Sequence, residues 1–495
     1  MDDASAASTP PLVLPRRTDL FYGGAWRPAL SGARTETRNP GSGALLCETA
    51  EARPEDVDAA VAAAQEGFQA WRDVAPLQRG RVLREFARRI RSHGRELAML
   101  DAADCGNPVA EMYADAEAGA AQLEFFAGLV TEMKGASIPM GPDAVNFSVR
   151  EPLGVVARIL PFNHPLLFCA GKTGAILAAG NALIVKPPDQ APLSALRLTE
   201  LCEDLFPPGV WNVLPSSREA SRHLAGHPGV AKVALIGSVP AGRAVMKAAA
   251  ETLKPVLLEL GGKNALIAFP DADPDEVAGA VVAGMNFTWC GQSCGSTSRA
   301  FLHADIHDAV LERVAKAAGR FRPGPPTDPK TTMGALVSRA QYDKTLGYIE
   351  TARAEGARLV CGGGPPADPE LKDGFFVEPT IFAEVTPAMT IARQEIFGPV
   401  LSVLRWSDEA EMLAEVNAVD YGLTCSIWTY DLDRAHRTAA RVQAGFVWVN
   451  EVGRHFLGAP FGGYKQSGLG REECLDELLA FTQEKNIHIR LRGKR

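Results

Sequence analysis

The chain has 495 residues, of which 46% are hydrophobic and 22% are charged, as in ordinary globular proteins. This length exceeds what one hydrophobic core usually organises, so we expect two or three domains. The net charge of -8 and the lack of a long Lys/Arg cluster exclude the pattern of a protein that binds nucleic acid or anionic lipid.

The N-terminal stretch, MDDASAASTPPLVLPRRTD, lacks the basic start, apolar core and cleavage site of a signal peptide. Residues 1–19 are therefore expected to form a flexible leader. The most apolar segment, GAILAAGNALIVK, is interrupted by Gly180 and Asn181 and is shorter than the roughly 20 residues that cross a bilayer. Nine cysteines without regular spacing favour free thiols in a reducing compartment. We expect a soluble, cytoplasmic protein with no membrane partner.

Short β-branched runs alternate with longer Ala-rich segments between about residues 151 and 262. The runs are VVARIL, ALIVK, VWNVL, VALIG and VLLEL, and the intervening segments, such as APLSALRLTELCEDLF, have helical spacing. Repeated βαβ units predict an α/β fold, with a mostly parallel sheet covered by helices on both faces. Such sheets bind ligands at the carboxyl ends of their strands, so the residues directly after these runs are site candidates.

A second alternation of strands and helices extends from about residue 263 to 462. The strand candidates are NALIAF, SRAFLH, PVLSVLRW, CSIWTY and GFVWVN, and the helix candidates include HDAVLERVAKAAGRF and DLDRAHRTAARVQAG, the last ending at Gly445. Two further segments, AVNFSVREP and NIHIRLR, alternate like strands but have no obvious partner. An unpaired edge strand is a liability, so we expect them to pair with each other or with another subunit, which favours an oligomer.

Two cysteines, Cys290 and Cys294, lie close together in FTWCGQSCGSTSR. With His303 and His307 they imitate a zinc finger, but eight residues separate the two pairs where fingers have about twelve. A dithiol redox pair usually has C-x-x-C spacing, and burial of both thiols as small hydrophobic groups is the ordinary alternative. The small, polar neighbours of Cys294 favour an accessible loop where backbone N–H groups stabilise a thiolate. Cys294 is therefore the candidate nucleophile, and we expect no metal site.

A thiol that attacks a carbonyl carbon needs a base and a group that stabilises the oxyanion. His303 and His307 have no geometry defined by the sequence that would make either one the base. Glu259 follows an apolar run, where partial burial would raise the pKa of its carboxyl toward a useful value. A structural ion pair explains the same residue, so both interpretations stay open at this point.

Cys294 and Glu259 lie within a series of motifs that closely resembles the aldehyde dehydrogenase superfamily from about residue 20 onward. The motifs are PFNHP at 161–165, KPPD at 186–189, LIGSVPAG at 235–242, LELGGK at 258–263, GQSC at 291–294, EIFGPV at 395–400 and PFGGYKQSGLGRE at 460–472. Each motif alone is modest evidence, whereas seven in the family's order are specific. The implied architecture is a Rossmann-type cofactor domain over 20–130 and 151–262, an α/β catalytic domain over 263–462, and a small β oligomerisation arm over 131–150 and 463–495.

The resemblance implies a role for each matching catalytic position. Cys294 would add to the aldehyde carbon, and collapse of the adduct would pass a hydride to the nicotinamide and leave a thioester. The Asn163 amide and the Cys294 backbone N–H would hold the oxyanion, although a turn before a proline is the ordinary interpretation of Asn163 alone. Glu259 would activate the water that hydrolyses the thioester. A relative that transfers the acyl group to CoA and a catalytically silent relative are the alternatives, and the intact catalytic residues argue against both.

The resemblance also implies cofactor contacts, although no G-x-G-x-x-G motif follows a strand. Lys186 would contact the adenine ribose, Glu395 the nicotinamide ribose and Phe397 the nicotinamide, and a helix opened by residues 237–242 would lie near the pyrophosphate. Asp189 stands where the family often has Glu, and a carboxylate there should repel a 2′-phosphate, so NAD is favoured over NADP. The full set of predicted cofactor-binding residues is Pro161, Phe162, Lys186, Asp189, Gly237, Ser238, Gly242, Leu260, Gly261, Glu395 and Phe397.

The substrate tunnel of the family corresponds here to His164 and to the stretch EVGRHFLG at 451–458. A basic and aromatic lining of this kind is compatible with a polar or aromatic aldehyde. The predicted substrate-lining residues are His164, Phe168, His455 and Phe461. The expected partners are a small aldehyde and further copies of the chain, as a homodimer or homotetramer, with no nucleic acid.

Overall fold

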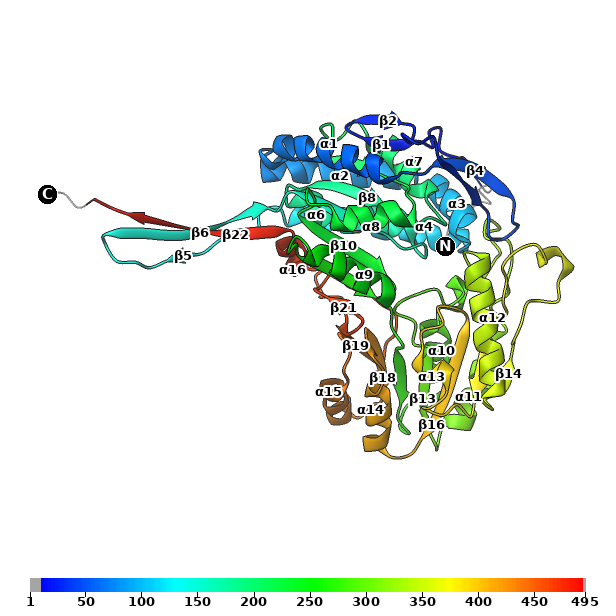
Figure 1. Cartoon of the computed structure of the whole chain (residues 1–495). Helices are drawn as coiled ribbons and strands as arrows, with labels where there is room; N and C mark the ends of the chain where they lie inside the picture. Colours follow the sequence, from blue (N-terminus) through cyan, green and yellow to red (C-terminus); the bar gives the residue numbers. More distant parts are fainter. Residues whose placement is uncertain (1–9, 493–495) are drawn as a thin grey trace, which may run out of the picture.

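The computed structural model describes residues 10–492, and Figure 1 shows two α/β domains from which a narrow arm projects. The first half of the chain, coloured blue to green, forms the upper domain, and most of the second half forms the lower one. Residues 10–19 form neither helix nor strand, and residues 1–9 of the expected leader lie outside the described part of the chain. Among the helices within residues 10–492, none is long and apolar enough to cross a membrane.

An eight-stranded sheet organises the first domain. The five strands predicted from β-branched runs lie side by side at its centre, all parallel, which confirms the predicted α/β class. A hairpin closes one edge of the sheet and a two-residue strand closes the other, both antiparallel. The order is β2 (Ala25–Arg27), β1 (Leu20–Tyr22), β9 (Trp211–Val213), β8 (Ala182–Lys186), β7 (Val155–Ile159), β10 (Lys232–Gly237), β11 (Val256–Leu260) and β21 (Gly468–Leu469).

The residue pattern of these strands explains why helices cover both faces of the sheet. In β8, Leu183 and Val185 belong to one hydrophobic cluster, whereas Ala182 and Ile184 belong to another. Alternate residues of a strand point to opposite faces, so an apolar strand requires cover on both sides. The helices of this domain are α1 (Pro54–Arg72), α2 (Pro76–Ser92), α3 (Gly94–Cys105), α4 (Val109–Gly128), α5 (Pro165–Gly171), α6 (Gly174–Ala178), α7 (Leu193–Cys202), α8 (Arg218–Gly226), α9 (Val239–Ala250) and α16 (Leu475–Ala480).

A seven-stranded sheet organises the second domain, and only its β14–β15 pairing is antiparallel. Hydrophobic clusters lie on both of its faces, as in the first domain. The strand order is β14 (Arg358–Cys361), β15 (Thr380–Ala383), β16 (Val400–Trp406), β13 (Arg299–His303), β12 (Ala265–Ala268), β18 (Thr424–Trp428) and β19 (Phe446–Val449). The helices are α10 (Pro274–Gly284), α11 (His307–Ala318), α12 (Arg339–Ala354), α13 (Thr390–Arg393), α14 (Glu409–Asn417) and α15 (Leu432–Arg441).

Helix α15 is shorter than predicted. The sequence predicts an end at Gly445, but the helix ends at Arg441, and Val442 is already extended, with φ -71° and ψ 132°. Gly445 has a different structural reason: a Cβ at this position would lie 1.8 Å from the carbonyl oxygen of Gly462. This glycine therefore marks a close crossing of two chain segments and not a helix cap.

The two segments without an obvious partner in the sequence pair with each other. Strand β6 (Ala144–Pro152) runs antiparallel to β22 (Thr482–Arg490) along the whole length of both, and β5 (Ser137–Ile138) adds a third strand. The predicted pairing is confirmed, and Figure 1 shows the three strands as an arm that leaves the body of the molecule. The remaining short elements are β3 (Arg34–Arg38), β4 (Leu45–Ala50), β17 (Tyr421–Gly422), β20 (Tyr464–Lys465) and the 3₁₀ turns Phe287–Trp289 and Pro369–Leu371.

Candidate active site

A cavity of about 270 Å³ lies between the two domains. The first domain lines it with α4, α5 and the end of β11, and the second domain contributes residues 286–295 and part of 448–461. The cavity therefore brings together segments that are far apart in the sequence. It is lined by all of the predicted catalytic and substrate-lining residues, namely Cys294, Glu259, Asn163, His164, Phe168, His455 and Phe461.

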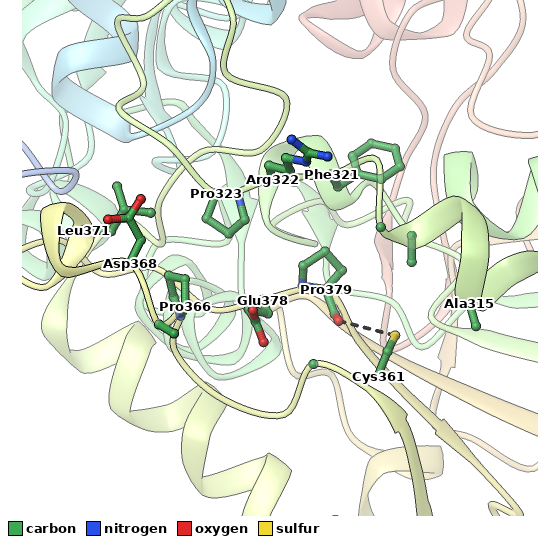
Figure 2. A pocket seen from close by; sticks show the side chains of 14 residues that line it. Ala315, Phe321, Arg322, Pro323, Cys361, Pro366, Asp368, Leu371, Glu378 and Pro379 are labelled. Carbon is green, nitrogen blue, oxygen red and sulfur yellow. Dashed lines mark hydrogen bonds between the residues drawn. The ribbon is translucent and has the colours of Figure 1, made fainter.

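A larger depression, of about 470 Å³, lies beside the end of α11 and shares no lining residue with this cavity. Figure 2 shows Asp368 and Glu378 in its wall, and the Cys361 thiol donating a hydrogen bond to the carbonyl oxygen of Pro379 at 3.7 Å. None of the predicted site residues lines this depression. Size alone therefore does not identify the site, whereas the convergence of predicted residues does.

The two neighbouring thiols face different surroundings. Cys290 adopts a left-handed conformation with φ 54°, is fully buried, and donates from Sγ to the carbonyl oxygen of Gly334 at 3.0 Å. Gly291 continues this turn with φ 65°. Steric clashes with a Cβ atom restrict this left-handed conformation mainly to glycine. The chain then turns back so that Cys294, which is half-buried, reaches the cavity. The Cys294 carbonyl oxygen accepts a hydrogen bond from the Asn264 amide at 2.7 Å, which anchors this loop.

The zinc-finger alternative would require both cysteines and both histidines to converge, and they do not. Cys290 packs into a hydrophobic cluster of the second domain. The His303 ring stacks edge-on against Trp406, with 4.7 Å between the ring centroids, and Nδ1 of His307 lies 2.8 Å from the Asp308 carboxylate. These side chains are therefore structural.

Glu259 occupies the carboxyl end of β11, next to the thiol. Only 4% of its surface is exposed, and burial raises the pKa of its carboxyl to about 8. Burial and then the Glu259 charge raise the pKa of the Cys294 thiol as well. One carboxyl oxygen, Oε1, has no hydrogen-bond partner among the described residues. No buried ion pair holds this carboxyl within residues 10–492, so the structural-ion-pair interpretation loses its basis.

Asn163 is held by its backbone while its side chain stays available. Its carbonyl oxygen accepts a hydrogen bond from the Asn107 amide at 2.6 Å. The residue is 4% exposed, lines the cavity, and precedes the proline that begins α5, so it also has the turn position that the sequence predicted. Its Oδ1 atom is buried without a partner in the described part of the chain. An amide fixed in this way can donate to an oxygen atom in the cavity.

A buried charged cluster beneath the cavity is a feature that the sequence analysis missed. The Lys172 ammonium lies 3.1 Å from Glu472 and 3.0 Å from Glu473, and Arg158 binds Glu472 at 2.8 Å. Nδ1 of His455 lies 3.0 Å from Glu473. Burial alone would raise the pKa of Glu473, but Lys172 and His455 lower it to about 2. Glu472 ends the PFGGYKQSGLGRE motif, which assigned it no role, and His455 was predicted only as a substrate-lining residue; no motif contains Glu473, Lys172 or Arg158.

The predicted cofactor-binding residues of the first domain lie along one edge of its sheet. Strands β8, β7, β10 and β11 are parallel neighbours, so the residues at their carboxyl ends form a row. Lys186 ends β8 and binds Asp189, whose side chain is 53% exposed. Ser238 caps α9 by accepting a hydrogen bond from the backbone N–H of Ala241 at 3.4 Å. The residues in this row are Pro161, Phe162, Lys186, Asp189, Gly237, Ser238, Gly242, Leu260 and Gly261.

Glu395 and Phe397 bring the second domain to the same edge. The Glu395 carboxylate accepts a hydrogen bond from the backbone N–H of Gly262 at 3.0 Å. The Phe397 ring lies edge-on to Phe162, with 5.7 Å between the centroids. The backbone of Phe397 has φ 57°, an uncommon conformation for this residue type, and the Gln341 amide donates to its carbonyl oxygen at 2.6 Å. A helix N-terminus, an exposed carboxylate and an aromatic wall fit a dinucleotide at this edge.

Comparisons with known proteins agree with this geometry. Residues 26–487 match the aldehyde dehydrogenase family model. The chain is 52% identical to aldehyde dehydrogenase tropH of Talaromyces stipitatus, over 99% of this chain and 96% of that protein. The NAD+ complex of an aldehyde dehydrogenase from Bacillus cereus is 36% identical, with a TM-score of 0.93 over 96% of this chain and 97% of that chain. PnpE from Pseudomonas sp. WBC-3 is 38% identical, with a TM-score of 0.94 over 97% and 99%.

This chain matches the family model over nearly its whole length. It also matches the solved structures of similar proteins over almost every residue. It therefore shares the fold and the class of reaction of the family. The structures of two such relatives contain NAD. A nicotinamide cofactor and an aldehyde substrate follow from this membership. The chain belongs to the aldehyde dehydrogenase family and is an aldehyde dehydrogenase.

Proposed function

We propose that this enzyme oxidises its aldehyde through a thioester on Cys294, with Glu259 as general base and Asn163 in the oxyanion hole. The observation that supports this proposal is the convergence of these three residues on one cavity. A thiol, a carboxyl of raised pKa and an unpartnered amide are the groups that covalent acyl chemistry requires.

In the first half of the reaction, Sγ of Cys294 attacks the aldehyde carbon and forms the C–S bond. Glu259 takes the thiol proton, since the two groups are close enough to shift each other's pKa. The negative charge on the former carbonyl oxygen is held by Nδ2 of Asn163 and the Cys294 backbone N–H. A bound nicotinamide would supply the hydride acceptor for the tetrahedral carbon, and loss of that hydride would leave the acyl group on the Cys294 sulfur.

In the second half, Glu259 has released the thiol proton to solvent and accepts a proton from a water molecule. The water oxygen attacks the thioester carbon, the C–S bond breaks, and the carboxylic acid leaves. A carboxyl whose pKa is about 8 can accept a proton and return it near neutral pH. The same residue therefore serves both halves, first for the thiol and then for water.

We also propose that NAD is preferred to NADP, that the enzyme is a homodimer or homotetramer, and that it is cytoplasmic. The exposed Asp189 carboxylate next to Lys186 supports the first proposal because it would repel a 2′-phosphate. The projecting arm supports the second, since its apolar Ile138, Val145 and Ile489 side chains are exposed in a single chain. All nine cysteines are free thiols, which supports a reducing compartment.

The experiment that tests the reaction measures NADH formation at 340 nm with a panel of aldehydes, with and without CoA. We expect NADH and the free carboxylic acid in the absence of CoA, and mass spectrometry should detect an acyl group on Cys294 when turnover of the wild-type enzyme is quenched with acid. Acyl-CoA as the sole product would contradict hydrolysis. A lack of turnover with every aldehyde would favour the catalytically silent alternative.

A further inference from the structure

His164 and Asp115 form a buried pair in the wall of the cavity. Nδ1 of His164 lies 2.7 Å from the Asp115 carboxylate, and each residue is 6% exposed. Both residues line the cavity that contains Cys294. Asp115 comes from the middle of α4, a helix whose buried side is otherwise mostly small and apolar, so a carboxylate at this position needs a partner.

The imidazole ring is fixed between aromatic rings. Trp289 lies perpendicular to it, with 4.6 Å between the centroids, and Phe168 packs against it at 5.7 Å. Trp289 is itself anchored, because its indole N–H donates to the Glu111 carboxylate at 3.1 Å. A ring held by one hydrogen bond and two edge contacts cannot swing away to find another partner.

The second ring nitrogen is left for the cavity. Nε2 of His164 has no hydrogen-bond partner within residues 10–492. Unlike the fully buried polar atoms that lack a partner, it is not completely enclosed by protein. It therefore retains accessible surface where the ring faces the cavity. The Nδ1–H group donates a hydrogen bond to the Asp115 carboxylate. A protonated ring therefore presents Nε2–H to the cavity as a second donor.

The charges around the ring favour its protonated form. Burial is the largest single effect and lowers the pKa of His164, but the Asp115 carboxylate, with smaller contributions from other acidic groups, raises the net pKa above the usual value. Asp101 and Glu111 are the other acidic groups that act on it in the same direction. A charged donor in a buried wall makes a strong hydrogen bond to an acceptor. If no acceptor is present, the unpaired donor destabilises the complex.

We propose that His164 selects aromatic aldehydes that carry a hydrogen-bond-accepting oxygen on the ring, such as a hydroxyl, methoxy or keto group, by donating to that oxygen from Nε2. This inference rests on the proposed function of the Cys294 cavity. The aromatic part of the preference comes from rings that line the cavity, including Phe168 and Trp289. His455 and Phe461 line the same cavity, with 4.5 Å between their ring centroids. An unsubstituted ring would fill the same space but leave the donor unpaired, and sites of this kind discriminate strongly against such analogues.

The test compares kcat/KM for benzaldehyde with that for the hydroxybenzaldehydes and methoxybenzaldehydes substituted at each ring position. The methoxy compounds accept but cannot donate, so they report specifically on a donor in the wall. We expect the best oxygenated isomer to exceed benzaldehyde by about tenfold to a hundredfold in the wild-type enzyme. We expect His164→Phe to reduce this ratio to near one and His164→Gln, which keeps an N–H donor, to restore part of it.

Two further variants separate recognition from folding. Asp115→Asn keeps an acceptor for Nδ1 but removes the charge, so the preference should be lost at a lower pH than in the wild type. Phe168→Leu changes the shape of the wall without changing the donor, so it should alter kcat/KM for benzaldehyde and for its oxygenated derivatives by similar factors. Thermal melting and NAD binding check that each variant is folded. If His164→Phe is unfolded, His164→Gln and Asp115→Asn provide the test instead.

The outcomes distinguish this proposal from the proposed function. Turnover of aldehydes with no preference for oxygenated rings, or an equal loss for all substrates in His164→Phe, would overturn the specificity role alone. A preference for hydroxyl but not methoxy compounds would also overturn it, because Nε2 would then be an acceptor. No NADH from any aldehyde in the wild type would overturn the reaction itself and the specificity role with it.

Discussion

Backbone conformation decides which of the two neighbouring cysteines reaches the cavity. Cys290 and Cys294 share one short stretch, yet the left-handed turn at Cys290 and Gly291 directs one thiol into a hydrophobic cluster and the other to the cavity. The buried thiol has a partner, the Gly334 carbonyl oxygen, whereas the other lies beside Glu259. The chemistry at this scale depends on the direction of single side chains.

The two thiols should respond differently to substitution. Cys294→Ala should lower kcat by at least about a thousandfold, since it removes the nucleophile, while NAD binding is kept. Cys290→Ala should keep most of the activity but lower the free energy of unfolding by about 1–2 kcal/mol, because it leaves a small cavity in the core. Steady-state kinetics and urea unfolding measure these effects, and equal loss of activity in both variants would contradict the assignment.

The pKa of Glu259 sets a pH dependence for the hydrolytic step. Burial raises this pKa to about 8, and the protonated carboxyl cannot accept a proton from water. Activity should therefore rise with pH through about 8 and fall off below it. In Glu259→Gln, kcat should be about a hundredfold lower or more and that rise should disappear. A pH profile of kcat tests this, and an unchanged profile in the variant would assign the titration to another group.

The cofactor preference depends on one exposed carboxylate. Replacing Asp189 with Ser should lower the ratio of kcat/KM for NAD to that for NADP by about tenfold, because repulsion of the 2′-phosphate is removed. Asp433→Ser, at an exposed position on α15, is the matched control and should leave the ratio unchanged. If both variants retain the wild-type ratio, Asp189 does not contact the cofactor ribose.

At the scale of elements, the site depends on short segments that meet at the ends of strands. Strand β21 has only two residues, yet it pairs with β11 so that Gly468 lies opposite Glu259. The segment after β21 supplies Glu472 and Glu473, which bind Lys172 just beyond α5. The C-terminal part of the chain thereby ties strand β11, which carries Glu259, to the wall of the cavity.

Removal of the buried ammonium should therefore destabilise the fold. Lys172→Met leaves two buried carboxylates without their shared cation, and we expect a loss of about 3–5 kcal/mol in the free energy of unfolding. Lys485→Met, which breaks the exposed pair with Glu151 at the arm, is the matched control and should cost less than about 1 kcal/mol. Chemical denaturation measures both, and equal effects would show that the cluster contributes no more than a surface pair.

At the scale of the whole molecule, the cavity lies between two domains that are each built on a mostly parallel sheet, and a three-stranded sheet leaves the body. The cavity needs both domains, because Glu259 and Asn163 come from the first and Cys294 comes from the second. The arm joins β6 to β22, which are more than 300 residues apart in the chain, and it presents open strand edges to solvent. These open edges support the proposal that the arm contacts another subunit.

Disruption of the arm should change the oligomeric state. Asn486 lies in the middle of β22, opposite Ser148, and Asn486→Pro removes a backbone N–H and restricts φ there. Analytical ultracentrifugation should find a smaller assembly than for the wild type at the same concentration. Asn486→Ala keeps the backbone N–H and should leave the assembly intact. A wild-type chain that sediments as a monomer would contradict the oligomer itself.

Much of the fold could be predicted from local patterns. The five central strands of the first sheet each appear as an apolar, β-branched run, because a parallel strand buried on both faces must be apolar throughout. The antiparallel strands β14 and β21 were not predicted, and the end of α15 was predicted at Gly445 instead of Arg441. Their boundaries depend on contacts with distant segments, such as that between Gly445 and Gly462, and these leave no periodic signal.

The sequence by itself determined the kind of enzyme and named the candidate reacting groups, because the thiol, the carboxylate and the amide each stand in a short motif. Only the tertiary structure decided how the cavity is made: which thiol reaches it, which carboxylates bind Lys172, and that Asp115 holds His164. The physical reason is that burial and charge pairing depend on segments brought together by folding. A local motif names the reacting groups, whereas their surroundings set their pKa values and the substrate that they accept.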